Sequence, residues 1–423
     1  MAAAFDTTDF PPKRSAALAR LAAFADGAAA DYARLRNFDR APQAPAAVSG
    51  LSPYLRHRAV TEHEVLAAVL ARWPLARVEK FVQEVFWRTY WKGWLQARPA
   101  VWTDYLQAVP QRLAELDGAG RRLYERACKG ATGIDAFDAW VGRLLSTGYL
   151  HNHARMWFAS IWAHTLRLPW ELGADFFLRH LLDGDPASNT LSWRWVVGLH
   201  TPGKTYLARA DNIAKYTEGR HAPRRLAAAA PVPSAPPLPA PQALSRLSPP
   251  PAGEAGLLLT SEDLHAESLP LAPATVAAVA LLPPLDGTGP QARAARGREF
   301  TAALAADALA RVGVHFGASA STLASAEVAA LIDWCRAHAL RRVLVAEAPV
   351  GPTADWLHAA QAPLAAAGIA LHPLRRPWDD LAWPHATRGF FGLAAKIPAL
   401  LAAAGLGRPG APGLLDQPEA AAP

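Results

Sequence analysis

Residues 147–195 read TGYLHNHARMWFASIWAHTLRLPWELGADFFLRHLLDGDPASNTLSWRW. Two polar clusters, HNHARM at 151–156 and DGDPASN at 183–189, enclose a long aromatic and apolar run. Such a run is expected to be buried, and polar groups beside it must be paired or must hold a ligand. The stretch therefore predicts a buried core with a polar binding site at its edge.

The chain around this stretch, residues 15–220, reads mainly as helices because its apolar residues recur at helical spacing. Thr61 is a predicted N-cap, and Glu64 three residues later completes a capping box. Residues 78–95, VEKFVQEVFWRTYWKGWL, are aromatic on several faces, which is typical of a deeply buried helix. The first half of the chain is thus predicted to be all-helical.

The second half changes character twice. Residues 225–256 are rich in Ala and Pro and hold no aromatics, which predicts an extended linker. From residue 257, short apolar runs alternate with helical stretches, which predicts a small parallel α/β domain. We therefore expect a helical domain at 1–224, a linker at 225–256 and an α/β domain at 257–423.

Composition sets limits on the class of protein. The net charge of +7 and the isoelectric point near 9.6 suit a polyanionic partner, although scattered basic groups suit a solvated surface equally well. Two cysteines rule out a disulfide scaffold and a cysteine-based zinc site, so no metal is expected. Without a signal-like start or a membrane-length apolar run, we expect a cytoplasmic protein that does not associate with membranes.

The second polar cluster has two interpretations. Asp183 and Asp185 could simply end one helix and cap the next. However, they lie between apolar and aromatic segments, and a buried carboxylate needs an Arg or a ligand donor. Arg155 is available upstream, which favours a binding site.

Both polar clusters resemble motifs of the photolyase/cryptochrome family, TGxxHNxxRM followed by DGDxxxN. The resemblance implies an α-helical FAD-binding domain. It places Asn152 and Arg155, which share a helix face, beside the flavin ring. It also implies that Asp183 and Asp185 contact the flavin edge, the Arg and the ribose or adenine, and that Asn189 faces flavin N5.

Residues 50–58, GLSPYLRHR, resemble the family's phosphate loop, and Ser49 and Ser52 match it. Serine hydroxyls and backbone N–H groups near a helix start could hold a diphosphate. The chain departs from the family at Val48 and Gly50, where the family has Thr and Arg. Alone, the loop could be a simple turn with Pro53. The resemblance assigns cofactor contacts here to Tyr32, Ser49, Leu51 and Ser52.

Glu84, Trp87 and Arg88 fall on one helix face. An ordinary Glu–Arg pair beside a core Trp would explain them. The resemblance implies instead that Glu84 supports a flipped pyrimidine dimer, that Trp87 stacks on it, and that Arg88 lies near the flavin. It also assigns Met156 and Trp195 to the lesion site, which must hold a base taken out of the DNA stack.

Electron delivery is a further implication of the resemblance. Trp193 matches the family's inner relay Trp and Trp170 the middle one. The outermost Trp has no counterpart, and Tyr124 or Trp162 is a candidate substitute. For each of these aromatics, core packing is the alternative role.

The predicted function is blue-light-driven repair of cyclobutane pyrimidine dimers in DNA by an FAD-containing photolyase, a carbon–carbon lyase. The alternatives are a non-repairing cryptochrome-like photoreceptor and a structural relative that binds little flavin. The C-terminal α/β domain resembles either a circularly permuted antenna domain or a generic Rossmann-like module. A second, antenna chromophore cannot be named from the sequence.

Overall fold

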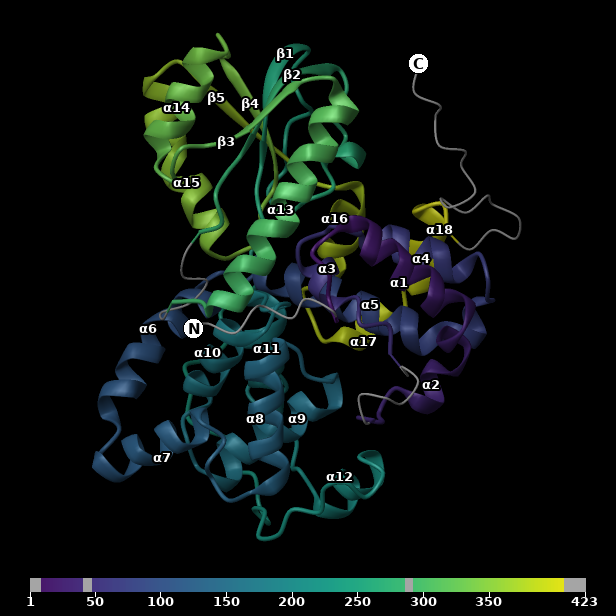
Figure 1. The fold of residues 1–423 in the computed structure, drawn as a ribbon, viewed down its shortest axis with the longest axis vertical. Helices are drawn as coiled ribbons and strands as arrows, with labels where there is room; N and C mark the ends of the chain where they lie inside the picture. Colours follow the sequence, from purple (N-terminus) through teal and green to yellow (C-terminus); the bar gives the residue numbers. More distant parts are fainter. Residues whose placement is uncertain (1–8, 41–47, 286–291, 407–423) are drawn as a thin grey trace.

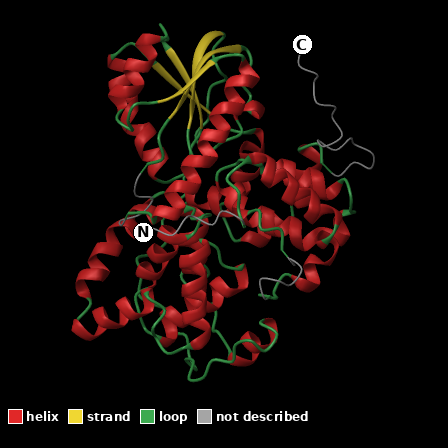
Figure 2. Cartoon of the chain, viewed as in Figure 1, coloured by secondary structure: helices red, strands yellow, loops and turns green. Residues whose placement is uncertain are grey.

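The structure, a computed structural model, describes residues 9–40, 48–285 and 292–406. In this view a helical part forms the lower portion of the molecule, and a sheet with flanking helices forms the top (Figures 1 and 2). The helices of the first half are α1 (Arg14–Asp26), α2 (Tyr32–Leu35), α3 (Ser52–Arg56), α4 (Glu62–Leu70), α5 (Leu75–Gln96), α6 (Ala100–Glu115), α7 (Gly118–Cys128), α8 (Asp135–Thr147), α9 (Asn152–Ser160), α10 (Trp170–His180), α11 (Pro186–Val196) and α12 (Ala210–Tyr216).

The local signals in the sequence explain where helices start. The hydroxyl of Thr61 accepts a hydrogen bond from Glu64 N, and the Glu64 side chain accepts one from Thr61 N, so the predicted capping box is confirmed. Helix α5 is buried on several faces because α2, α4, α11 and the C-terminal helices all pack against it. Because several faces of α5 are buried in these contacts, aromatic residues occur on several faces of the helix.

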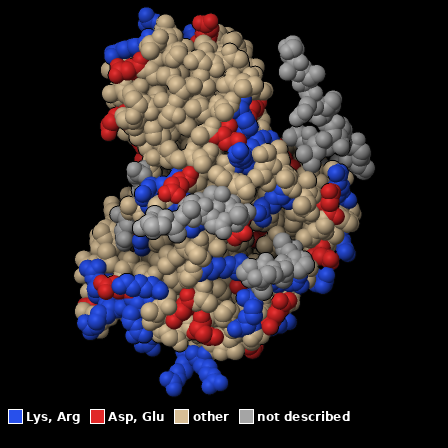
Figure 3. All heavy atoms as spheres, in the orientation of Figure 1, with Lys and Arg blue, Asp and Glu red and all other residues tan. Residues whose placement is uncertain are grey.

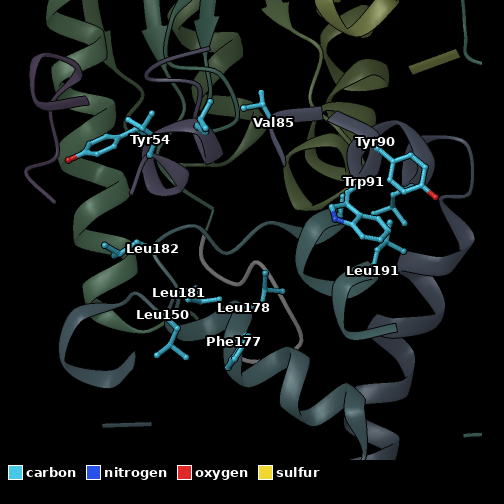
Figure 4. Packing of buried hydrophobic residues seen from close by; sticks show 14 of the residues in the cluster. Tyr54, Val85, Tyr90, Trp91, Leu150, Phe177, Leu178, Leu181, Leu182 and Leu191 are labelled. Carbon is cyan, nitrogen blue, oxygen red and sulfur yellow. The ribbon is translucent and has the colours of Figure 1, made fainter. Parts of the chain in front are cut away.

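The helical core is built from closely packed aromatics. Trp102, Trp140, Trp157, Trp162 and Trp193 are among its largest fully buried side chains. Figure 4 shows part of this core, with Phe177 and Leu178 of α10 and Leu181 just after it near Leu150, and Leu191 of α11 beside Trp91 of α5. The long apolar run between the two polar clusters therefore lies in the core, as its composition predicts.

The upper part is a parallel five-stranded sheet built from β1 (Gly253–Leu259), β2 (Ala274–Leu281), β3 (Ser319–Thr322), β4 (Arg342–Ala346) and β5 (Ala370–Leu374). The strand order is β3-β2-β1-β4-β5. Helix α13 (Ala295–Phe316) packs on β2 and β3, and α15 (Pro352–Ala366) packs on β5 and against α14 (Val328–Ala337). The predicted α/β class is confirmed. The apolar runs in the sequence do not indicate β3, because its sequence SAST is exposed and has no apolar pattern.

The end of the described chain returns to the helical part. The sequence grouped residues 377–403 with the α/β domain, but α16 (Pro377–Ala382) and α17 (Phe390–Ala394) pack against α5. Trp378 Nε1 donates to Thr89 Oγ1 at 3.0 Å, and a side chain at Gly93 would meet Trp383 and Ala386 at 2.9 Å. The glycine thus permits this close approach. The three-part domain division stays a prediction, with residues 377–403 packed on the helical side.

Residues 225–252 contain neither helix nor strand and run past the helical part, where Arg98 Nε donates to Pro239 O at 3.1 Å. Helix α18 (Ile397–Ala403) closes the described chain near α4 and α1 (Figure 1). Among the described helices, none combines the length and the apolar content needed to cross a bilayer. Charged side chains are concentrated over the helical part in the view of Figure 3, with Lys and Arg interspersed with Asp and Glu.

Candidate functional site

The acidic cluster lies where the chain turns between α10 and α11, at residues 181–185. Asp185 is the N-cap of α11, and its Oδ1 accepts a hydrogen bond from Ser188 N at 2.8 Å. Its other oxygen, Oδ2, faces Arg56 Nε at 3.9 Å, Arg88 Nη1 at 3.7 Å and Lys92 Nζ at 3.8 Å. Asp185 therefore caps a helix and also faces three cations.

Burial by itself would raise the pKa of Asp185. The cations of Lys92, Arg56 and Arg88 outweigh burial and hold the pKa of Asp185 well below its ordinary value. The carboxylate is thus ionised at neutral pH, in a place where an unpaired charge would be strongly unfavourable.

Asp183 is the second acid of the cluster. Its Oδ2 accepts from Arg155 Nη2 of α9 at 2.9 Å, and Arg155 Nε donates to Leu150 O at 2.9 Å. Burial raises the pKa of Asp183, but Arg155 and the Ser52 hydroxyl lower it overall. The structure therefore joins the two sequence motifs through a direct ion pair.

The loop at residues 48–52 lies next to these acids. Ser49 Oγ accepts from Leu51 N at 3.4 Å, and the carbonyl oxygen of Ser52 is 3.5 Å from Arg88 Nη2. Together with the Ser52–Asp183 interaction, this places the predicted phosphate loop beside the cluster. Tyr32, also expected at the phosphate end, lies beside Glu84 and Arg36, and burial followed by the Glu84 charge raises its pKa.

Arg20 of α1 was not identified from the sequence. Gly50 has a left-handed φ of +62°, and the position of a Cβ there would be 2.7 Å from Arg20 Nη1. A guanidinium from another helix thus lies over the position at which the resemblance expects an Arg side chain. No local pattern in the sequence predicts the contact between Arg20 and Gly50, because α1 and the loop are thirty residues apart.

Replacing Arg20 with Ala should weaken FAD binding about three- to tenfold, because a cation near a phosphate in a partly exposed position contributes on the order of 1 kcal/mol. Titration of the apoprotein with FAD, followed by flavin fluorescence, measures this. Arg34→Ala, on an exposed position of α2, is the control. Equal affinity of the Arg20 and Arg34 variants would contradict a cofactor role for Arg20.

The predicted lesion residues come from three helices. Glu84 and Trp87 are half-buried on α5, Met156 on α9 and Trp195 on α11, and α11 packs against both other helices. Glu84 pairs with Arg36, and Trp195 stacks on Tyr206 with ring centres 6.0 Å apart. The structure brings the helices together, and the roles of these four side chains stay predictions.

One face of Trp87 has an unforeseen neighbour. Phe390 of α17 stacks on it, with ring centres 3.8 Å apart and planes 12° from parallel. Phe390 is buried, and Tyr90 OH donates to the preceding Arg388 carbonyl at 2.9 Å, which holds the segment in place. Sequence reasoning could not find this contact because it joins residues three hundred positions apart.

Three candidate relay residues, Trp193, Trp162 and Tyr124, form a chain of neighbouring rings. This chain does not pass through Trp170, which the resemblance gives as the middle relay residue. Among the described residues, the ring of Trp193 has Trp162 at 6.3 Å, and Trp162 has Tyr124 at 6.0 Å. The ring of Trp170, the expected middle member, lies 6.1 Å from the ring of Tyr105. Both candidate substitutes for the missing outer Trp therefore lie on one path from Trp193.

The two asparagines differ in environment. Asn189 is buried and its Nδ2 donates to Ala174 O at 2.8 Å, which fixes the side-chain orientation and leaves Oδ1 as an acceptor. Asn152 is exposed at the start of α9, on the same helix as Arg155. Contacts of either residue with a flavin stay predictions.

The polar atoms of the cluster fit a polar, charged cofactor. Asp183 Oδ1, Arg88 Nη1 and Lys92 Nζ are buried and have no hydrogen-bond partner among the described residues. Buried polar groups are normally paired, so three unpaired atoms around two acids indicate a place for a ligand's own donors and acceptors. Reduced to its chemistry, the site offers two carboxylates and several cations beside an aromatic core.

Comparison with known proteins shows what this part of the chain is similar to. Residues 81–220 match the family profile described as the FAD binding domain of DNA photolyase. The helical part of this chain is therefore similar to the FAD-binding domain of the photolyase/cryptochrome family. The matched range includes α9, α10, α11 and most of α5, and it contains both acids and all four predicted lesion residues of the candidate site.

Individual photolyases resemble the chain over this region. The deoxyribodipyrimidine photo-lyase of Synechococcus sp. is 32% identical over 191 residues, covering 44% of this chain and 38% of that protein. The enzyme of Streptomyces griseus is 34% identical over 181 residues, covering 40% and 38%. A class III photolyase structure from Agrobacterium tumefaciens is 28% identical, with a TM-score of 0.42, and covers 50% of this chain and 44% of that one. The chain thus spans about two-fifths of the length of these curated relatives.

Proposed function

We propose that the protein is an FAD-dependent photolyase that uses blue light to split cyclobutane pyrimidine dimers in DNA. The observation that carries this proposal is the acid and cation cluster around Asp183 and Asp185, with its unpaired buried atoms, inside the segment that matches the photolyase FAD-binding domain. Glu84 and Trp87 lie on the same helix as Arg88, so a lesion site next to the cofactor is consistent with the fold.

FAD bound at this site would supply light-driven transfer of one electron to the dimer and its return, which splits the cyclobutane ring without net oxidation. The protein's part is to bind and orient. Asp183 and Asp185 would accept hydrogen bonds from the cofactor, and Arg88, with Ser49 and Ser52, would hold its phosphates. Glu84 would accept a hydrogen bond from a flipped base, while Trp87, Met156 and Trp195 would provide its apolar walls. Basic side chains on the helical part would contact DNA phosphates.

A cryptochrome-like, non-repairing photoreceptor is the second candidate. The stack of Phe390 on Trp87 favours it, because that face of the indole is already occupied. A base could then reach only the other face or the edge of Trp87.

Assay of blue-light repair by wild type and by Phe390→Leu separates the two functions. Repair by the wild type supports the photolyase. If the wild type binds FAD but repairs no dimer, and the Leu variant does repair, Phe390 blocks the site and the receptor candidate gains. If neither repairs, the proposed enzyme activity is wrong.

Replacing Trp162 with Phe should slow light-driven reduction of bound FAD about tenfold or more. The path from Trp193 to Tyr124 would then contain a ring that is much harder to oxidise. Illumination with an external thiol, followed by flavin absorbance, measures the rate. Trp157→Phe, a fully buried Trp outside this path, is the control. Equal rates in the Trp162 variant and the wild type would show that electrons take another route.

A further inference from the structure

Lys92 is buried in an unusual way. It lies one helical turn after Arg88 on α5, its side chain is 1% exposed, and its Nζ has no hydrogen-bond partner among the described residues. Its nearest acid is Asp185, 3.8 Å away, and Arg88 Nη1 is likewise unpaired at 3.7 Å from the same oxygen. Both cations thus point at Asp185 without a hydrogen bond.

The other charges near Lys92 have closer partners. Arg56 forms a two-bond ion pair with Glu262, at 2.5 and 2.8 Å. Glu62, the second acid that acts on Lys92, lies 3.3 Å from Arg58. Arg88 and Lys92 therefore share the remaining charge of Asp185 between them.

A buried ammonium without hydrogen bonds is unfavourable, because water no longer solvates it. Burial accordingly lowers the pKa of Lys92, although Asp185 acts in the opposite direction. For a lysine, a lowered pKa in the folded state means that its charged form destabilises the fold near neutral pH. Lys92 thus contributes little to the stability of the apoprotein. A bound anion would offset the cost of burying its charge.

We propose that Lys92, together with Arg88, binds an anionic group of FAD. FAD offers two such groups, its diphosphate and, when reduced, its ring. The site already contains the Ser52 loop and two unpaired cationic N–H groups, which suits either. This inference rests on the proposed function, since it takes FAD as the ligand, and it adds a residue that the family motifs do not include.

The test compares Lys92→Met with the wild type, and uses Lys80→Met, at an exposed position of the same helix, as the matched control. Two quantities are measured: the dissociation constant for FAD, by fluorescence titration, and the melting temperature of the apoprotein. If Lys92 binds the diphosphate, we expect Lys92→Met to raise the dissociation constant for FAD about tenfold or more. The melting temperature of its apoprotein should be unchanged or higher, and Lys80→Met should match the wild type in affinity.

Two further measurements tell the anionic groups apart. If the diphosphate is the partner, Lys92→Met also weakens the binding of ADP. If the reduced ring is the partner, ADP binding is unchanged and the midpoint potential of the bound flavin becomes more negative. Either result supports the proposal.

An FAD affinity equal to that of the wild type, together with an unchanged midpoint potential of the bound flavin, overturns the proposal. So does a loss of affinity accompanied by a lower melting temperature of the apoprotein, because that indicates a structural role. Should the Met variant not fold, Lys92→Gln is measured in the same way. If the wild type itself binds no FAD, the proposed function fails as well, so the two failures are distinguishable.

Discussion

Replacing Asp185 with Asn is expected to abolish FAD binding and to destabilise the protein by about 3–5 kcal/mol, the usual effect of breaking a buried charge cluster from one side. The amide can still cap Ser188 N, so the start of α11 should survive. The loss of charge leaves Arg88 and Lys92 without their shared acid. Chemical denaturation of the apoprotein and FAD titration measure the two effects.

Asp175→Asn is the matched control for this prediction. Asp175 is fully buried on α10 and accepts from Arg179 Nε at 2.7 Å, so its replacement also breaks a buried ion pair. It lies outside the acid cluster, and we expect the variant to lose stability but to retain FAD binding. If Asp185→Asn bound FAD as tightly as the wild type, the cluster would not be the cofactor site.

Replacing Glu84 with Gln should lower the rate of dimer repair about 10–100-fold while leaving FAD affinity unchanged, because a hydrogen bond to a charged group contributes roughly 1.5–3 kcal/mol. Glu84 is half-buried, pairs with Arg36 and precedes Trp87 by one helical turn. A repair assay on a dimer-containing oligonucleotide under reducing conditions measures the rate.

Glu79→Gln, at an exposed position of the same helix, should repair at the wild-type rate. Unchanged repair in Glu84→Gln would remove Glu84 from the lesion site. A parallel loss of FAD would instead assign Glu84 to cofactor binding. The two variants together therefore separate a role toward the substrate from a role toward the cofactor.

The sequence predicted those parts of the site that lie in contiguous motifs. Arg155 and Asp183 sit in two motifs on neighbouring elements, and their ion pair follows from helix packing near in sequence. The capping box at Thr61 and the parallel α/β class followed from local patterns in the same way. Local spacing is sufficient where the interacting residues share an element or adjoining ones.

Other features depend on contacts between segments far apart in the chain. Arg20 of α1 meets Gly50 in the loop before α3, and Phe390 meets Trp87 only because the C-terminal helices return to α5. Lys92 reads as an ordinary polar position of α5 until the burial by surrounding helices is known. Such residues carry no motif, since their environment is created by tertiary packing.

The most direct test of the central claim uses one purified sample. Its absorption spectrum is recorded after incubation with FAD and removal of free cofactor, and the same sample is then illuminated with a dimer-containing oligonucleotide under reducing conditions. We predict flavin bands near stoichiometric amounts and repair that depends on blue light. Absence of retained flavin, or retained flavin without any light-dependent repair, would contradict the assignment as a photolyase.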